Sequence, residues 1–408
     1  MEDIAITENS IGIGDVPGFE LAGVHCDVRE NQNPRLDLAL IFAPTACSAA
    51  GVFTQNDIKA APVRLDQSLL ARGERYHGII INSGNANACT GEQGMRDAQT
   101  MLVLTAAHCG VRAEQLFVCS TGRIGRALPM PNIAKGIELA CQQKGCSPQH
   151  SSDAAQAILT SDTRPKTVTA RFDWNGQTLT VAGMAKGAGM IEPNMATMLA
   201  FIATDADVSS YLLQNFLNKA NSGSFNAITV DGDMSTNDTV LCLANGTSGV
   251  RVTSDEVALC ERFQAALNAV CNSLAKKIVG DGEKVTKLVT LKVCGAANSA
   301  SAERVARAIG NSLLVKTSWF GGDPNWGRIM DAAGYARVGL VEDHIDLYYN
   351  DCPVLLKGNP VTENAPQWRA IVAESRFSIT LNLNLGTADY QLLSADLSEA
   401  YVRFNKSE

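Results

Sequence analysis

The sequence predicts a layered fold of mixed strands and helices, either α/β or α+β. Strand-like and helix-like segments alternate along its 408 residues, and 46% of these residues are apolar. Only 19% are charged, whereas an average soluble domain has about 25%. A chain with so much apolar sequence can bury a large core, and this excludes an intrinsically disordered protein.

The strands give the clearest local signals. Residues 38–43 and 78–81 are short apolar runs bounded by turn residues, as strands buried in a sheet would be. Residues 167–180 are rich in β-branched side chains on both sides of Asn175-Gly176. That dipeptide favours the left-handed backbone of a type I′ turn, so we expect a β-hairpin there.

Two helices are indicated by caps and periodicity. Apolar residues recur at helical spacing from Cys260 to Ile278, and Ser254 precedes them as the expected N-cap. Asp323 stands directly before Pro324, a combination that is typical of the start of a helix. We therefore expect Asp323 to cap a second helix.

The length of the chain predicts two or three domains, at roughly 150 residues per domain. Residues 280–287 form a glycine-rich stretch that follows the long helix and precedes β-rich sequence. We therefore expect a main domain at 1–285 and a smaller α/β domain at 286–408.

Composition and charge exclude several partners and sites. The chain has 34 basic and 42 acidic residues, a net charge of −8, so it lacks the basic excess that neutralises nucleic-acid phosphates. Its apolar runs are far shorter than the ~20 residues of a membrane-spanning helix, and its N-terminus does not resemble a secretory signal. Its 12 cysteines include no CxxC pair. We expect buried thiols in a reducing cytoplasm and no bound metal.

One segment departs from ordinary strand or helix patterning: residues 186–199, KGAGMIEPNMATML. Its glycines allow a close approach of the backbone, and Pro193 favours an extended or turned path. Thr197 then opens an apolar run. One interpretation makes Thr197 the N-cap of a helix, and the other makes it an exposed nucleophile.

A threonine hydroxyl needs a base before it can act as a nucleophile, and no histidine lies near Thr197 in the sequence. Its own α-amino group can be that base if the chain is first cut between Ala196 and Thr197. The hydroxyl can make this cut by attacking the Ala196 carbonyl, which gives an ester that water hydrolyses. The released amine has a reference pKa of about 7.7–8.0, which suits a base at neutral pH.

The same segment resembles the signature of the ornithine acetyltransferases of cyclic arginine biosynthesis, also called glutamate N-acetyltransferases. The resemblance extends from about residue 18 to the C-terminus, because further blocks follow in the order of the family. These blocks are NSGNANACTG (82–91), STG (120–122), TSDT (160–163), VDGDMSTND (230–238), GDGE (280–283) and DPNWGR (323–328). Several blocks in register are far more specific than one short motif.

The resemblance implies the fold, the chemistry and the assembly. The fold would be α+β, an αββα sandwich of two sheets between helical layers, with 286–408 completing the substrate site. The precursor would cleave itself into an α chain (1–196) and a β chain (197–408), typically assembled as α2β2. Thr197 would take the acetyl group from N2-acetyl-L-ornithine and pass it to L-glutamate, in a ping-pong reaction without a cofactor. Whether acetyl-CoA serves as a second acetyl donor is left open.

The resemblance also identifies residues around the nucleophile. Thr121 and Gly122 match the oxyanion hole, although the same residues would suit a strand-ending turn. Lys186 would pair with the α-carboxylate of the substrate and Glu283 with the δ-ammonium of ornithine. The alternative for both is a solvated surface charge. The positions that match the substrate-binding set are Thr160, Lys186, Thr197, Glu283 and Asn405.

Some positions depart from the pattern of the family. Lys284 and Val285 replace a Gly-Ala pair beside Glu283, and Arg123 adds a charge beside the oxyanion hole. The sequence ends shortly after Asn405, so we expect the family's terminal substrate contact to be missing or changed. The aspartates within 231–238 lack the spacing of an EF-hand calcium loop, and we expect a hydrogen-bonded turn instead.

Two other functions stay open. A related N-terminal-nucleophile amidase or aminopeptidase would use water in place of glutamate, and its acetate release would ignore added glutamate. A binding or scaffold protein would have kept the fold without catalysis, and its chain would stay uncut at full length.

Overall fold

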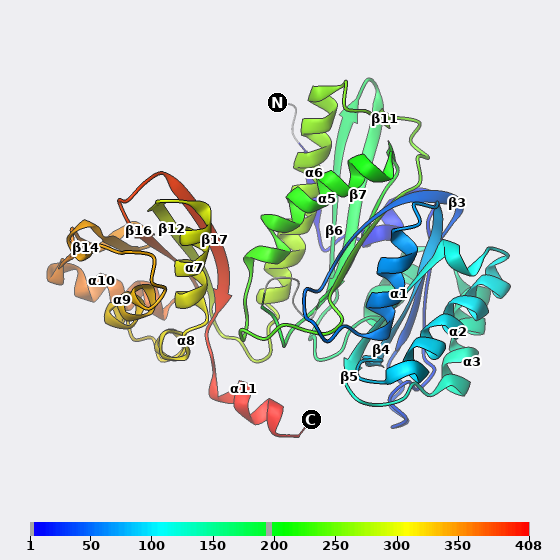
Figure 1. Cartoon of the computed structure of the whole chain (residues 1–408), viewed down its shortest axis with the longest axis horizontal. Helices are drawn as coiled ribbons and strands as arrows, with labels where there is room; N and C mark the ends of the chain where they lie inside the picture. Colours follow the sequence, from blue (N-terminus) through cyan, green and yellow to red (C-terminus); the bar gives the residue numbers. More distant parts are fainter. Residues whose placement is uncertain (1–3, 193–197, 408) are drawn as a thin grey trace. The chain divides into compact units, whose positions relative to one another are not determined.

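The computed structural model describes residues 4–192 and 198–407, and these divide into two compact units (Figure 1). The first unit comprises residues 4–187, 198–226 and 234–278, and the second comprises 188–192, 227–233 and 279–407. Two short segments from the middle of the sequence therefore belong to the second unit. The expected boundary after residue 285 stays a prediction about independently folding domains.

The first unit is built on hydrogen-bonded strands that run in the order β1-β6-β7-β8-β10-β3-β4-β5, with β2 also paired to β3. Their bounds are β1 Ala5–Glu8, β2 Glu20–Val24, β3 Leu38–Phe53, β4 Tyr76–Asn85, β5 Leu116–Arg123, β6 Lys166–Trp174, β7 Gln177–Lys186, β8 Leu199–Thr204 and β10 Thr239–Ala244. A separate pair consists of β9 (Asp207–Val208) and β11 (Arg251–Val252).

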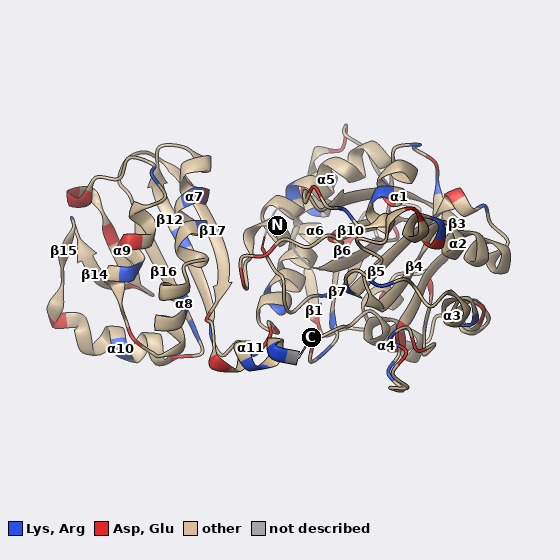
Figure 2. Ribbon diagram, turned by 60° about the horizontal axis from the view of Figure 1, so that its bottom comes forward, with Lys and Arg blue, Asp and Glu red and all other residues tan. Residues whose placement is uncertain are grey.

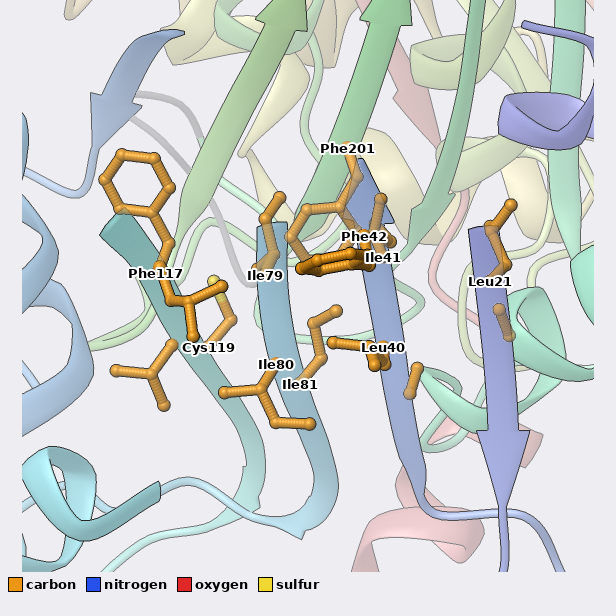
Figure 3. Close-up of a cluster of buried hydrophobic side chains, with 14 of the residues drawn as sticks. Leu21, Leu40, Ile41, Phe42, Ile79, Ile80, Ile81, Phe117, Cys119 and Phe201 are labelled. Atoms are coloured by element: carbon orange, nitrogen blue, oxygen red, sulfur yellow. The ribbon is translucent and has the colours of Figure 1, made fainter. Parts of the chain in front are cut away.

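The long strand β3 joins two sections of this sheet. Its first half pairs with β2 and β4, and its second half pairs with β10. Side chains from both sections belong to one buried hydrophobic cluster, which contains Phe201 of β8 and Ile41 and Phe42 of β3 (Figure 3). The two sections therefore share a core, as two sheets of a sandwich do.

Helices cover the outer sides of this first unit. One set packs against the β2–β5 section and consists of α1 (Ala61–Leu70), α2 (Gly91–Cys109), α3 (Met130–Gln143) and α4 (Pro148–Ala157). The other set consists of α5 (Ser210–Ser222), which packs on β3, and α6 (Val257–Val279). Phe216 of α5 packs against Phe263 of α6 with the rings tilted and 5.1 Å between their centroids. The predicted α+β fold, with sheets between helical layers, is confirmed.

The second unit has its own sheet, in the order β15-β14-β13-β16-β12-β17. Its strands are β12 Leu288–Ala296, β13 Asp346–Tyr349, β14 Cys352–Leu356, β15 Asn359–Pro360, β16 Arg376–Asn382 and β17 Ala388–Ala395. Its helices are α7 Ser299–Gly310, α8 Leu313–Phe320, α9 Trp326–Gly334, α10 Ala365–Ala373 and α11 Glu399–Phe404. Helix α7 packs on β12 and β17, and the core contains Trp319, Tyr349 and Phe377.

The two short segments of the second unit attach at the β17 edge. The N–H of Thr229 donates to the carbonyl of Leu393 in β17 at 2.8 Å, and the N–H of Val230 donates to the carbonyl of Ile191 at 2.7 Å.

Short 3₁₀ turns complete the described residues: η1 Gly12–Asp15, η2 Ala113–Gln115, η3 Phe225–Ala227, η4 Glu342–His344, η5 Thr362–Asn364 and η6 Asn405–Ser407.

The strong local signals in the sequence lead to the predicted elements. The apolar runs lie in β3 and β4, and the hairpin of β6 and β7 turns at Asn175 and Gly176, with φ of +51° and +79°. The strands of both units are mostly tan in Figure 2, with the charged residues mainly on helices and loops. Among the described residues, no helix is long and apolar enough to span a bilayer.

Both predicted helix caps are wrong, although the helices exist. Helix α6 begins at Val257, so Ser254 lies in the turn that precedes it. Helix α9 is capped by Asn325, whose side chain accepts the N–H of Arg328, and Asp323 instead accepts a hydrogen bond from the Asn325 side chain. For α9, the residue directly before the helix takes the capping place.

Candidate active site

Thr121 and Gly122 lie near the end of strand β5, which runs parallel to β4. They pair in register with Ser83 and Gly84, so the expected alternative of a turn after the strand is wrong. Gly122 has a φ of +135°, and a Cβ there would lie 2.2 Å from the carbonyl carbon of Gly84. Only glycine can occupy this position without displacing the β4 backbone.

Lys186 ends strand β7 and is buried, with 2% of its surface exposed. Its Nζ donates to the Oγ1 of Thr121 at 3.2 Å. The interpretation of Lys186 as a solvated surface charge is therefore wrong. A buried ammonium requires compensating charge nearby, because its desolvation is costly.

Asp162 supplies that charge and also organises the surrounding backbone. Its Oδ1 accepts hydrogen bonds from Lys166 Nζ at 2.6 Å and from the N–H of Gly187 at 2.7 Å, while its Oδ2 accepts the N–H of Thr160 at 3.1 Å. Burial alone would raise the pKa of Asp162, but the charges of Lys186 and Lys166 outweigh it and hold this pKa well below its usual range. Asp162 thus links the predicted residues Thr160 and Lys186.

The second unit brings together Glu283 and Asn405. The Nδ2 of Asn405 donates to the Oε2 of Glu283 at 3.1 Å, and the N–H of Glu283 donates to the carbonyl of Ala188 at 2.8 Å. A Cβ at Gly189 would lie 2.5 Å from the Glu283 carboxyl carbon, so the carboxylate rests against the glycine backbone. The neighbouring Lys284, which departs from the family pattern, places its ammonium 5.1 Å from the ring centre of Phe404.

The predicted cleavage site, Ala196 and Thr197, lies outside the described residues. The chain resumes at Met198, and strand β8 begins at Leu199. A strand, not a helix, therefore follows Thr197, and the interpretation of Thr197 as a helix N-cap is wrong. The N–H of Met198 donates to the Oδ1 of Asp238 at 2.9 Å.

Two buried aspartates near the predicted residues were not assigned to the site from the sequence, which placed Asp238 only in an expected hydrogen-bonded turn. Asp162 lies within the TSDT block and Asp238 ends the VDGDMSTND block, so a carboxylate inside each block was the available signal. Burial raises the pKa of Asp238 well above its usual range, although the Met198 N–H and the charge of Lys186 act against this. Within the described residues, no group of three His, Cys, Asp or Glu side chains is placed to hold a metal.

The first unit thus presents a buried ammonium, a threonine hydroxyl that accepts from it, and a glycine at a position closed to other residues. An ammonium can bind a carboxylate, and hydroxyl and backbone N–H donors can stabilise an oxyanion. An enzyme that transfers an acyl group to or from an amino acid needs both. The fold and this site fit that class, α+β enzymes of acyl transfer.

Comparisons with known proteins define the family. The ArgJ family model matches residues 20–407. The arginine biosynthesis bifunctional protein ArgJ of Symbiobacterium thermophilum is 44% identical over 396 residues, 97% of this chain and 98% of the relative. The corresponding protein of Geobacter sulfurreducens is 43% identical over 392 residues, 96% of this chain and 98% of the relative. The chain belongs to the ArgJ family.

Among solved structures, that of the arginine biosynthesis bifunctional protein ArgJ of Bacillus halodurans is similar to this chain. The match covers 48% of this chain and 100% of that chain, with 36% identity and a TM-score of 0.45.

Proposed function

We propose that this chain cleaves itself between Ala196 and Thr197 and then transfers acetyl groups through an ester on Thr197. Membership of the ArgJ family gives the activity: the chain is a glutamate N-acetyltransferase (ornithine acetyltransferase) of arginine biosynthesis. The observation that best supports the proposed chemistry is the buried pair of Lys186 and Thr121 beside Gly122.

The first reaction is the cut itself. The Thr197 hydroxyl adds to the Ala196 carbonyl, its proton passes to the Thr197 nitrogen, and the peptide C–N bond breaks to leave an ester. Water then hydrolyses the ester, which frees the Ala196 carboxylate and the Thr197 hydroxyl. The new α-amino group lies beside that hydroxyl and can act as its base.

The transfer then proceeds in two similar halves. The Thr197 hydroxyl adds to the acetyl carbonyl of N2-acetyl-L-ornithine, and ornithine leaves with the proton that the α-amino group collected. L-Glutamate then adds its amino group to the acetyl carbon of the Thr197 ester. The bond from that carbon to the Thr197 oxygen breaks, a proton from the glutamate amine passes to this oxygen through the α-amino group, and N-acetylglutamate leaves. Each half forms a tetrahedral oxyanion, for which the proposed donors are the Gly122 N–H and the Thr121 hydroxyl.

The hydrogen bond from Lys186 to Thr121 determines whether the Thr121 hydroxyl donates or accepts. Lys186 is a donor only, so the Thr121 oxygen accepts from it and its own O–H remains to donate elsewhere. An oxyanion is the acceptor that this O–H would meet during the reaction. The Lys186 ammonium would also attract the α-carboxylate that both amino-acid substrates carry.

The remaining predicted residues are assigned by charge and chemistry. The Glu283 carboxylate is a counter-ion for the δ-ammonium of ornithine, and Asn405, which donates to Glu283, holds that carboxylate in place. Thr160 supplies a further polar contact to the substrate. The proposed enzyme uses no cofactor because the amide donor already carries the acetyl group. We also propose that the enzyme is cytoplasmic and assembles as α2β2. Acetyl-CoA is a second acetyl donor to be tested.

The test is a transfer assay with N2-acetyl-L-ornithine and isotopically labelled L-glutamate. Labelled N-acetylglutamate is expected, together with exchange of labelled ornithine into N-acetylornithine when glutamate is absent, because the first half-reaction is reversible. Thr197→Val should abolish cleavage and both reactions. Acetate release that ignores glutamate would instead identify a hydrolase, and transfer without exchange would exclude the covalent intermediate.

A further inference from the structure

One loop of the described chain begins and ends with an aspartate that holds backbone near the predicted cleavage site. The loop runs from Asp231, in the second unit, to Asp238, which directly precedes β10 in the first unit. Each aspartate makes its contacts within its own unit. Neither is among the residues that the sequence assigned to the nucleophile, the oxyanion hole or the substrate.

Asp231 holds the segment that leads to the cleavage site. Its Oδ2 accepts the N–H of Met190 at 2.6 Å, and its Oδ1 accepts the N–H of Ile191 at 2.7 Å. The hydroxyl of Tyr401 donates to Oδ2 at 3.3 Å, and the N–H of Asp233 donates to Oδ1 at 3.3 Å. Met190 has a φ of +60°, a left-handed conformation that is uncommon for a residue with a side chain. The paired hydrogen bonds from Met190 and Ile191 stabilise this strained backbone.

Asp238 holds the chain on the other side of the cleavage site. Its Oδ1 accepts the N–H of Met198 at 2.9 Å, and that nitrogen is bonded to the carbonyl carbon of Thr197. Asp238 is fully buried, and its Oδ2 has no hydrogen-bond donor among the described residues. Lys186 is the charged group that acts on it.

We propose that Asp231 and Asp238 are positioning residues for self-cleavage, which fix the backbone before and after the Ala196–Thr197 bond. This inference rests on the proposed self-cleavage. Attack of a hydroxyl on the preceding carbonyl requires the reacting atoms to lie within about 3–3.5 Å in the correct orientation. Each aspartate fixes described backbone within its own unit, at Met190 and Ile191 in the second unit and at Met198 in the first. Backbone held at these residues has fewer conformations to sample before the reacting geometry is reached.

The proposed role makes different demands on the two carboxyl groups. Asp231 uses both oxygens to accept N–H groups, so an asparagine, with one oxygen, would lose one of them. Asp238 uses one oxygen, so an asparagine can keep the hydrogen bond from Met198. Asp233 is an exposed residue of the same loop and provides a matched control.

The experiment measures the rate at which full-length chain disappears during synthesis of each variant, by pulse labelling and denaturing gel electrophoresis. Asp231→Asn and Asp238→Ala are expected to slow cleavage by about ten- to a hundredfold, the effect of an ångström-scale misplacement. Asp238→Asn and Asp233→Asn are expected to cleave within about threefold of the wild-type rate. Circular dichroism and thermal unfolding establish that each variant is folded.

The rescue at position 238 separates positioning from a general structural role. Wild-type rates for both Asp231→Asn and Asp238→Ala would overturn the inference. Equal slowing of Asp238→Asn and Asp238→Ala would also overturn it, because the carboxyl would then act by charge or proton transfer. If Asp238→Ala does not fold, Asp231→Asn decides alone. A wild-type chain that never cleaves would refute the proposed function itself, and this inference with it.

Discussion

Replacing Gly122 with alanine is expected to lower kcat for acetyl transfer by about a hundredfold. The added Cβ would lie 2.2 Å from the carbonyl carbon of Gly84 and 2.5 Å from the nitrogen of Asn85, whereas ordinary contact begins at 3.4 Å. The β5 end would have to move by about 1 Å relative to β4. Misplacement of this size, or loss of one oxyanion donor, costs about 10²-fold or more.

The assay follows transfer from N2-acetyl-L-ornithine to L-glutamate and expresses kcat per cleaved chain. The KM values should change little, because the oxyanion exists only in the transition state and the intermediate. Gly125→Ala is the matched control. Gly125 also has a positive φ, +79°, but no atom would lie within 4 Å of its Cβ. This control is expected to keep kcat within about threefold of wild type.

Two results would refute the reasoning for Gly122. One is a folded Gly122→Ala variant with wild-type kcat, which would mean that the β5 end takes no part in catalysis. The other is a rise in KM with kcat unchanged, which would place Gly122 in ground-state binding and not at the oxyanion.

Three further predictions follow from the charged groups. Lys186→Met should raise KM for both amino-acid substrates and lower kcat/KM by about 10- to 150-fold, since a charge-assisted hydrogen bond contributes about 1.5–3 kcal/mol. A variant with the kcat/KM of the wild-type enzyme would contradict the role of Lys186. Gly189→Ala should displace the flexible Glu283 carboxylate and weaken binding of acetylornithine. The thermal unfolding midpoint should stay unchanged, because the atoms close to the added Cβ belong to the end of the Glu283 side chain. A lowered midpoint with normal binding would contradict this role of Glu283. Asp162→Asn should destabilise the protein by about 3–5 kcal/mol at pH 7, since it leaves buried lysines without their carboxylate. Because the folded-state pKa of Asp162 is lowered, its stabilisation is present above the ordinary value of 3.8 and is lost as the pH falls below it. The free energies of unfolding of the wild-type protein and Asp162→Asn, measured by denaturant titration, should therefore differ less at pH 3 than at pH 7. A difference that does not change with pH would refute the role of the Asp162 charge.

The sequence predicted those parts of the fold that local pattern determines. The apolar runs of β3 and β4 and the Asn175-Gly176 turn are short-range signals, and each corresponds to the expected element. The helix caps were mistaken because several residues before a helix can serve as the cap, and the chosen start of the helix depends on its packing. The sequence did not predict that residues 188–192 and 227–233 belong to the second unit. Thr229 bonds to Leu393 of β17, while Ala188 and Ile191 bond to Glu283 and Val230, all far apart in the sequence.

The same division applies to the site. Lys186, Thr121, Glu283 and Asn405 were predicted from motifs, and each has the contacts described for its unit. Asp162 and Asp238 were not assigned to the site, because the backbone N–H groups of Gly187 and Met198 that they bind lie 25 and 40 residues away in the sequence. No periodicity or spacing records such contacts. They arise where neighbouring strands bring a loop beside a buried amide or ammonium group.

The most direct test of the proposed self-cleavage is amino-terminal sequencing of the purified protein, combined with the intact mass of each chain. We expect two polypeptides, one that ends at Ala196 and one that begins Thr-Met-Leu-Ala-Phe. A single uncut polypeptide with full transfer activity would contradict the account, because Thr197 would then have no α-amino group to serve as its base.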